Sequence, residues 1–162
     1  MKFNWIALAA AMTLTAPAFA ESHGDAMMAP TGDADAGEAA FRQCVACHIV
    51  QNDEGETLAG RRAQTGPNLY QISGRSAGTV EDFRYSDAMV AAGEAGLVWN
   101  EETFSAYVQD PTGYLREFLD DSGARGKMAF RVRKEEDAVN LYAYLASLSP
   151  AEDMMEEAPS TN

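Results

Sequence analysis

The chain has 162 residues, with 25 acidic and 12 basic side chains and a formal net charge of −13 at pH 7. A length of this order fits one domain with terminal extensions. So large a negative charge repels phosphate backbones and anionic lipid headgroups, which argues against nucleic acid as a partner.

The N-terminus has the pattern of a secretory signal peptide over residues 1–20. Lys2 supplies the positive charge, residues 6–14 form a short apolar run, and Ala18 and Ala20 frame a cleavage site. The run is too short for a typical membrane-spanning helix, although an uncleaved leader that anchors the chain is the alternative. We expect cleavage after Ala20 and a periplasmic location.

Two further segments are expected to lie outside the folded domain. Residues 21–36 are rich in Ala, Gly, Asp and Pro and show no apolar periodicity, which predicts a flexible leader. Residues 150–162 begin with Pro150 and contain four acidic side chains, which predicts an acidic flexible tail. The folded domain is therefore expected over residues 37–149.

A helix is expected over residues 37–47, and at its end lies the sequence CVACH, residues 44–48. Cys-x-x-Cys-His is the pattern that attaches a c-type haem. Cys44 and Cys47 lie on the same side of one helical turn, so both thiols can reach the vinyl groups of one porphyrin. His48 can then offer a ring nitrogen to the iron, and the motif predicts one covalently bound haem.

Other uses of these residues make further demands on the sequence. A thioredoxin-like redox pair requires a neighbouring βαβ pattern, and no strand-like run follows. A structural zinc site requires four Cys or His ligands, whereas the chain has two of each type, and His23 falls in the leader. A plain disulfide between Cys44 and Cys47 also fits the sequence.

The middle of the domain is predicted to be largely irregular. Residues 51–65 are polar and contain glycine, which is typical of a surface loop, and a turn follows at Gly66-Pro67. A short helix is expected over residues 86–92. Long loops are unusual in a chain of this size unless they have a surface to wrap around, and a haem provides such a surface.

Three helices are predicted in the C-terminal half of the domain. The first begins after Asn100, a good N-cap, and ends before Pro111. The second covers residues 112–119, and the third precedes Pro150 with apolar residues spaced by three and four. Because no stretch shows sustained alternation of apolar and polar residues, the fold class is all-α.

Iron bound by His48 needs a second protein ligand if the protein is to carry electrons without binding small molecules. Two of the eight methionines, Met89 and Met128, fall within the expected domain. A core position explains Met89, which lies in a predicted helix. Met128 lies in a glycine-containing loop that can place its thioether against iron, so it is the predicted axial ligand; a plain core methionine is the alternative.

Six segments between residues 37 and 148, in this order, resemble the class I cytochromes c, specifically the bacterial cytochrome c2 or c-550 type that is related to mitochondrial cytochrome c. The segments are GEAAFRQCVACH, TGPNLYQISGR, DFRYSDAM, LVWNEETFSAYVQDP, GKMAF and DAVNLYAYLASL. A haem-attachment motif alone is common, but six segments in register are highly specific. The resemblance implies a class I cytochrome c fold, with helices and long loops wrapped around one haem.

The same resemblance implies the ligands of that haem. Cys44 and Cys47 would hold the porphyrin, and His48 and Met128 would ligate the iron. The carbonyl of Pro67 would accept a hydrogen bond from the other ring nitrogen of His48, which fixes the ring.

Five more residues match family positions around the haem. Arg75, Tyr85 and Trp99 match the residues that gather around the propionates, since a buried carboxylate needs donors. Tyr107 matches the tyrosine that approaches the methionine sulfur, and Phe130 matches the aromatic residue at the exposed haem edge. On spacing alone, the tyrosines and the tryptophan equally fit ordinary core positions.

The chain also departs from the family pattern. Gly126 stands where a threonine often reaches a propionate, and Met89 stands where a polar residue is frequent. Gly37, Phe41, Leu141 and Tyr144 do match, at the positions where the first and last helices cross.

These observations predict a soluble periplasmic one-electron carrier that is not an enzyme. A quinol–cytochrome c oxidoreductase would be its donor, and a terminal cytochrome c oxidase or another periplasmic redox protein its acceptor. The alternatives are a dedicated redox subunit of one periplasmic dehydrogenase complex, or a peroxidase-like haem enzyme if the methionine ligand is absent. We expect a monomer that docks through basic residues clustered near Met128 without an intervening acid: Arg125, Lys127, Arg131, Arg133 and Lys134.

Overall fold

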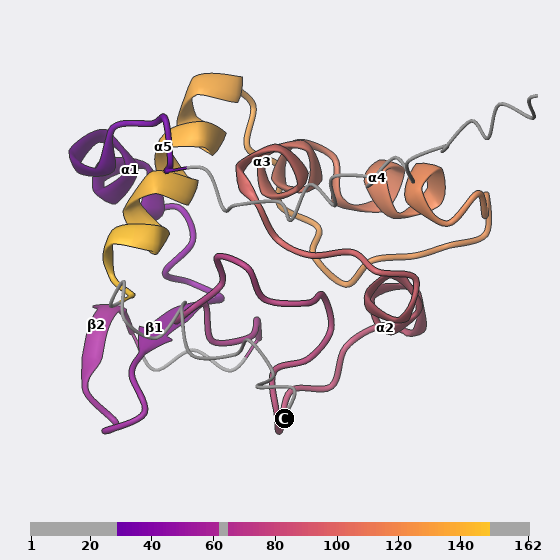
Figure 1. Ribbon diagram of the computed structural model, residues 1–162, viewed down its shortest axis with the longest axis horizontal. Coiled ribbons are helices and arrows are strands. Elements are labelled where there is room, and N and C mark those ends of the chain that lie inside the picture. The colour runs from indigo at the N-terminus through magenta and orange to yellow at the C-terminus, as the bar shows by residue number, and fades with distance from the viewer. Residues whose placement is uncertain (1–28, 62–64, 150–162) are drawn as a thin grey trace, which may run out of the picture.

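Five helices and one two-stranded sheet form the described part of the chain, which is residues 29–61 and 65–149 of a computed structural model (Figure 1). The predicted signal peptide, most of the predicted leader and the acidic tail lie outside these residues. Among the described helices, none has the length and apolar character that crossing a bilayer requires. In chain order the elements are α1 (Ala34–Phe41), β1 (Ile49–Gln51), β2 (Thr57–Gly60), α2 (Asp87–Glu94), α3 (Glu101–Gln109), α4 (Pro111–Phe118) and α5 (Glu135–Ser147).

The corner between α3 and α4 is placed by local signals, as predicted. Asn100 Oδ1 accepts a hydrogen bond from the backbone N–H of Thr103 at 2.8 Å, and the Thr103 hydroxyl accepts one from the N–H of Asn100 at 2.9 Å. This reciprocal capping box starts α3. Asp110 caps α4, and Pro111 occupies the first turn of that helix, where its missing N–H costs nothing.

The N-terminal helix differs from its prediction at both ends. Helix α1 begins at Ala34, inside the segment expected to be a flexible leader, because the Asp33 side chain accepts a hydrogen bond from the N–H of Ala36 at 3.0 Å. Thr31 is also held, since its N–H and its hydroxyl each contact the Glu101 carboxylate at 2.6 Å. The helix ends at Phe41, and the Cys-x-x-Cys-His motif follows in a series of turns.

The prediction of a polar surface loop over residues 51–65 is wrong for its middle part. Strands β1 and β2 pair antiparallel there, with an irregularity between Val50 and Gln51. Val50 is fully buried, and Leu58 and Ala59 pack against the core. Strands of three and four residues are too short for the alternation by which a strand is recognised in a sequence.

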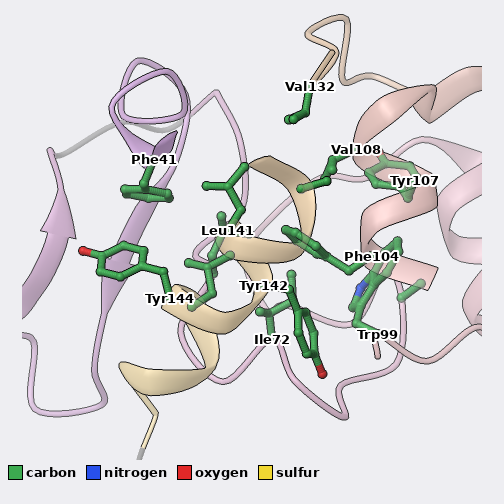
Figure 2. Packing of buried hydrophobic residues seen from close by; sticks show 14 of the residues in the cluster. Phe41, Ile72, Trp99, Phe104, Tyr107, Val108, Val132, Leu141, Tyr142 and Tyr144 are labelled. Carbon is green, nitrogen blue, oxygen red and sulfur yellow. The ribbon is translucent and has the colours of Figure 1, made fainter. Parts of the chain in front are cut away.

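Helices α1 and α5 cross at close range and fix one end of the core. A Cβ atom at Gly37 would lie 2.0 Å from the backbone oxygen of Asn140, so only glycine permits this approach. The rings of Phe41 and Tyr144 lie 5.6 Å apart across the crossing. Figure 2 shows Phe41 and Tyr144 on one side of α5 and the α3 side chains on the other, so α5 joins the two parts of the core. The implied helix crossing is therefore observed.

We predict that Gly37→Ala destabilises the protein by about 2–3 kcal/mol, because the added methyl group has to push α1 away from α5. This loss exceeds the gain in helix propensity of about 1 kcal/mol. Chemical denaturation of the purified protein measures the change. Glu38→Ala, at an exposed position of the same helix, is the control. Equal stability of the two variants would contradict the close crossing.

Candidate functional site

A cavity of about 400 Å³ lies at the centre of the domain, and segments from α1 to α5 contribute to its wall. The lining is mainly apolar and aromatic, with few polar groups. Such a combination is typical of a site for a cofactor or another small molecule. All ten residues predicted from the sequence lie along this wall: Cys44, Cys47, His48, Pro67, Arg75, Tyr85, Trp99, Tyr107, Met128 and Phe130.

Two thiols and an imidazole occupy one side of the cavity. Cys44 and Cys47 are both free and half-buried. The backbone N–H of His48 donates to the carbonyl of Cys44 at 2.9 Å, so the turn that holds the cysteines also positions the imidazole. His48 Nδ1 lies 3.0 Å from the carbonyl oxygen of Pro67. A Cβ atom at Gly66 would lie 2.5 Å from the nearest ring atom of His48, so this glycine leaves room for the imidazole.

The protonation state of His48 follows from this environment. Burial lowers the pKa of the imidazole, and the Pro67 carbonyl only partly opposes that shift. The ring is therefore neutral at pH 7. Because a carbonyl oxygen can only accept, Nδ1 carries the proton and Nε2 keeps its lone pair. A neutral imidazole held in this tautomer is the form that binds a metal.

The Cys44 thiol is also in its neutral form before any reaction. Burial, and then the neighbouring Cys47, raise the pKa of Cys44 to about 11. Cys44 is therefore protonated at neutral pH, which makes it a poor nucleophile towards disulfides and alkylating agents.

Arg75 and Trp99 lie side by side on another part of the wall. Residues 74–77 pair with residues 97–99 through backbone hydrogen bonds, which include Trp99 N–H to Arg75 O at 3.0 Å. The Arg75 guanidinium donates to the carbonyls of Tyr70 at 2.7 Å and Asn68 at 3.1 Å. Burial lowers the pKa of Arg75, and nearby Tyr85 partly offsets this. The side chain thus brings a positive charge and spare donors to the cavity.

Tyr107, Met128 and Phe130 also line the cavity. Tyr107 comes from α3, is 9% exposed and packs 5.0 Å from the ring of Trp99. Burial strongly raises the pKa of its hydroxyl, which therefore stays protonated and can donate. Met128 is half-buried, whereas Phe130 is 43% exposed. The cavity therefore has one edge close to solvent.

Several wall residues were not predicted as site residues. Phe83 packs edge-on against Tyr85 at 4.7 Å between ring centres, and Ser86 caps α2. Met89, expected to be a core residue, is 6% exposed and lies in both the core and the cavity wall. All three lie in the stretch DFRYSDAM, which resembles the family but from which only Tyr85 was predicted as a site residue.

The residues present fit a covalently attached haem. Two free thiols, a neutral imidazole and a thioether line one cavity whose other walls are apolar rings. Among residues 29–61 and 65–149 no group of three or more His, Cys, Asp or Glu side chains could hold a metal ion by itself. A metal bound here therefore needs further ligands, which a porphyrin provides.

Known proteins share both the sequence and the fold. The chain matches no protein-family model. It is 65% identical to cytochrome c2 of Rhodovulum adriaticum over 123 residues, which are 76% of this chain and 98% of the relative. It is 38% identical to cytochrome c-550 of Paracoccus versutus over 152 residues, which are 93% of this chain and 91% of the relative. The chain belongs to the cytochrome c2 family.

Solved structures of this family agree with the fold. Cytochrome c2 from Rhodobacter sphaeroides superposes with a TM-score of 0.71 at 53% identity, covering 72% of this chain and 95% of that one. Ferric cytochrome c-550 from Paracoccus versutus gives a TM-score of 0.69 at 40% identity, covering 74% and 99%. The class I cytochrome c fold is thereby confirmed, and the short sheet is its only departure from an all-α description within the described residues. As a cytochrome c2, the protein is an electron carrier with one covalently bound haem c, and not an enzyme.

We predict that Arg75→Lys destabilises the protein by about 1–2 kcal/mol. A lysine ammonium cannot reproduce the fork that reaches both the Tyr70 and Asn68 carbonyls, so one of these acceptors is left unpaired. Denaturation of the haem-containing protein measures this. The same exchange at exposed Arg42 is the control. If both variants unfold at the same denaturant concentration, the two carbonyl contacts do not contribute to stability.

Proposed function

We propose that this cytochrome c2 is a periplasmic carrier that takes one electron from a quinol–cytochrome c oxidoreductase and passes it to a terminal oxidase or another periplasmic redox protein. In this proposal Cys44 and Cys47 hold the haem, and His48 and Met128 ligate its iron. The signal peptide of residues 1–20 exports the chain, which acts as a monomer. The main support is the presence of the imidazole and the Met128 thioether in one cavity.

The chain contributes ligands, orientation and shielding. The haem iron supplies a one-electron couple between Fe(II) and Fe(III). The Pro67 carbonyl holds the His48 ring with Nε2 free for the iron. Met128 would be the second protein ligand of the iron, which would exclude small molecules and raise the reduction potential.

The cavity wall also favours a high reduction potential. The buried rings of Trp99 and Tyr107 exclude water, and a site without water disfavours the additional positive charge of the oxidised iron. Arg75, Tyr85 and Trp99 supply donors for the propionates. Phe130 is exposed at the rim, so a haem held in the cavity would have this edge within reach of a partner.

We predict that Met128→Ala keeps the covalent haem but loses the iron–sulfur absorption band of the oxidised protein. The reduction potential should fall by the order of 0.1 V, because axial ligands are a main determinant of haem potentials. Cyanide should bind the variant rapidly. Mass spectrometry, optical spectra and redox titration provide the readouts.

Met89→Leu is the matched control, because Met89 is the other methionine in this wall. The leucine retains the volume and the apolar character, so the band and the potential should stay close to those of the wild type. Loss of the band in Met89→Leu but not in Met128→Ala would assign the axial ligand to Met89 instead.

The basic segment is proposed to dock acidic partners. Arg125, Arg133 and Lys134 are exposed, and within the described residues their side chains have no recorded partner. Phe130 lies between them in the sequence and at the cavity rim. A positive face on a strongly negative protein creates a dipole, which turns this rim towards an acidic partner and raises the association rate.

We predict that Arg133→Glu and Lys134→Glu slow electron transfer to the oxidase several-fold at low ionic strength, and that salt removes the difference. Arg61→Glu carries the same charge change at an exposed position directly after β2, outside the basic segment, and should have a smaller effect. Stopped-flow rates over a salt series measure this. Wild-type rates that rise with salt, or equal effects of all three reversals, would place docking elsewhere.

A further inference from the structure

The chain between α4 and α5 carries Met128 past the cavity, and its residues 124–132 are here called the Met128 segment (Figure 1). Among the described residues, no backbone–backbone hydrogen bond involves residues 125–131. The ends are held, since Ala124 O accepts from Arg116 Nε at 3.1 Å and Val132 N donates to Val108 O at 2.9 Å. Between these ends, side chains have to hold the segment in place.

Lys127 makes one such contact. Its ammonium donates to the backbone carbonyl of Arg84, which lies 43 residues earlier in the chain. Phe83 and Tyr85, the neighbours of Arg84, both line the cavity, as does Met128. The contact therefore joins two separate parts of the cavity wall on the N-terminal side of Met128.

Arg131 makes the second contact, on the C-terminal side of Met128. Its Nη2 lies 2.7 Å from Asp110 Oδ1. The same carboxylate oxygen accepts a hydrogen bond from the N–H of Gly113 at 3.2 Å, so it also caps α4. Because Asp110 is at the corner between α3 and α4, this ion pair joins the Met128 segment to a fixed part of the fold.

We propose that Lys127, through the Arg84 carbonyl, and the Asp110–Arg131 ion pair are positioning contacts that keep the Met128 segment closed over the cavity. The proposal rests on the proposed function, in which Met128 ligates the iron. Two of the five basic residues expected to dock partners thus act first within the protein. They set the fraction of molecules in which Met128 has left the iron.

Both contacts are exposed, so each is expected to have a modest effect. Their arrangement matters more than their individual strength, because they hold the chain on both sides of one side chain. Removing either contact lengthens the unheld part of the segment and raises the population of its open form.

The test measures imidazole binding to the oxidised haem-containing protein, followed by the loss of the iron–sulfur band. Imidazole binds the iron only after Met128 has left, so its apparent affinity reports the open population. We expect Lys127→Ala and Asp110→Asn each to raise this affinity about threefold. Asparagine retains an oxygen that can cap α4 and removes only the charge that pairs with Arg131.

The controls separate this effect from charge alone. Lys127→Arg retains a donor and should bind imidazole about as weakly as the wild type. Lys134→Ala and Arg133→Gln remove positive charges for which the described residues show no side-chain partner, and should change little.

If Lys127→Ala and Asp110→Asn bind imidazole no better than Lys134→Ala, the two contacts do not hold the segment and the proposal is wrong. A failure of the proposed ligation looks different: the wild type would then lack the iron–sulfur band, and Met128→Ala would bind imidazole no better than the wild type.

Discussion

The whole domain depends on filling the cavity at its centre. Four of the five helices in the described residues have only eight or nine residues, and helices shorter than about 12–15 residues are marginal by themselves. Their apolar faces meet around the cavity as well as against each other. An empty apolar space of that size costs stability, whereas a flat apolar ring contributes about 25 cal/mol for each Å² it removes from water. The haem is therefore part of the core, and the fold and the site cannot be separated.

The side of the cavity formed by residues 44–48 combines local and distant contacts. The turn from Cys44 to His48 places two thiols and an imidazole within five residues, and its backbone bond from His48 to Cys44 sets their relative orientation. A distant residue then selects the tautomer, because the Pro67 carbonyl can accept only from a protonated Nδ1. Gly66 leaves room for the ring. The thiols and the imidazole are thus supplied by one turn, whereas the orientation and tautomer of the His48 ring depend on a loop almost twenty residues away.

This division explains what the sequence could predict. The haem motif, the start of α3 at Asn100 and its end before Pro111 can each be recognised from neighbouring residues. The structure confirms both ends of α3, and the cytochrome c2 relatives confirm the haem. The early start of α1 and the small sheet were missed. Asp33 is a local cap for α1, but the composition around it is that of a flexible leader, and its N–H also donates to distant Asn140 Oδ1 at 2.8 Å. The short strand at Val50 is defined by its pairing with β2. The wall positions of Arg75, Trp99 and Tyr107 came from resemblance to the family, because spacing alone also fitted core aromatics and a surface charge.

The rim near Met128 has to meet two opposing demands. Electron transfer requires an exposed edge, and Phe130 is 43% exposed there, whereas a high potential requires that water stay away from the iron. A segment whose residues 125–131 make no backbone–backbone hydrogen bond within the described chain gives a partner close access, but the proposed methionine ligand is then easy to lose. In the proposed role, Lys127 and Arg131 reconcile the two demands, because their contacts with Arg84 and Asp110 hold the segment from the exposed surface. The basic charge of this segment can thus stabilise the closed site while Arg133 and Lys134 face the solvent.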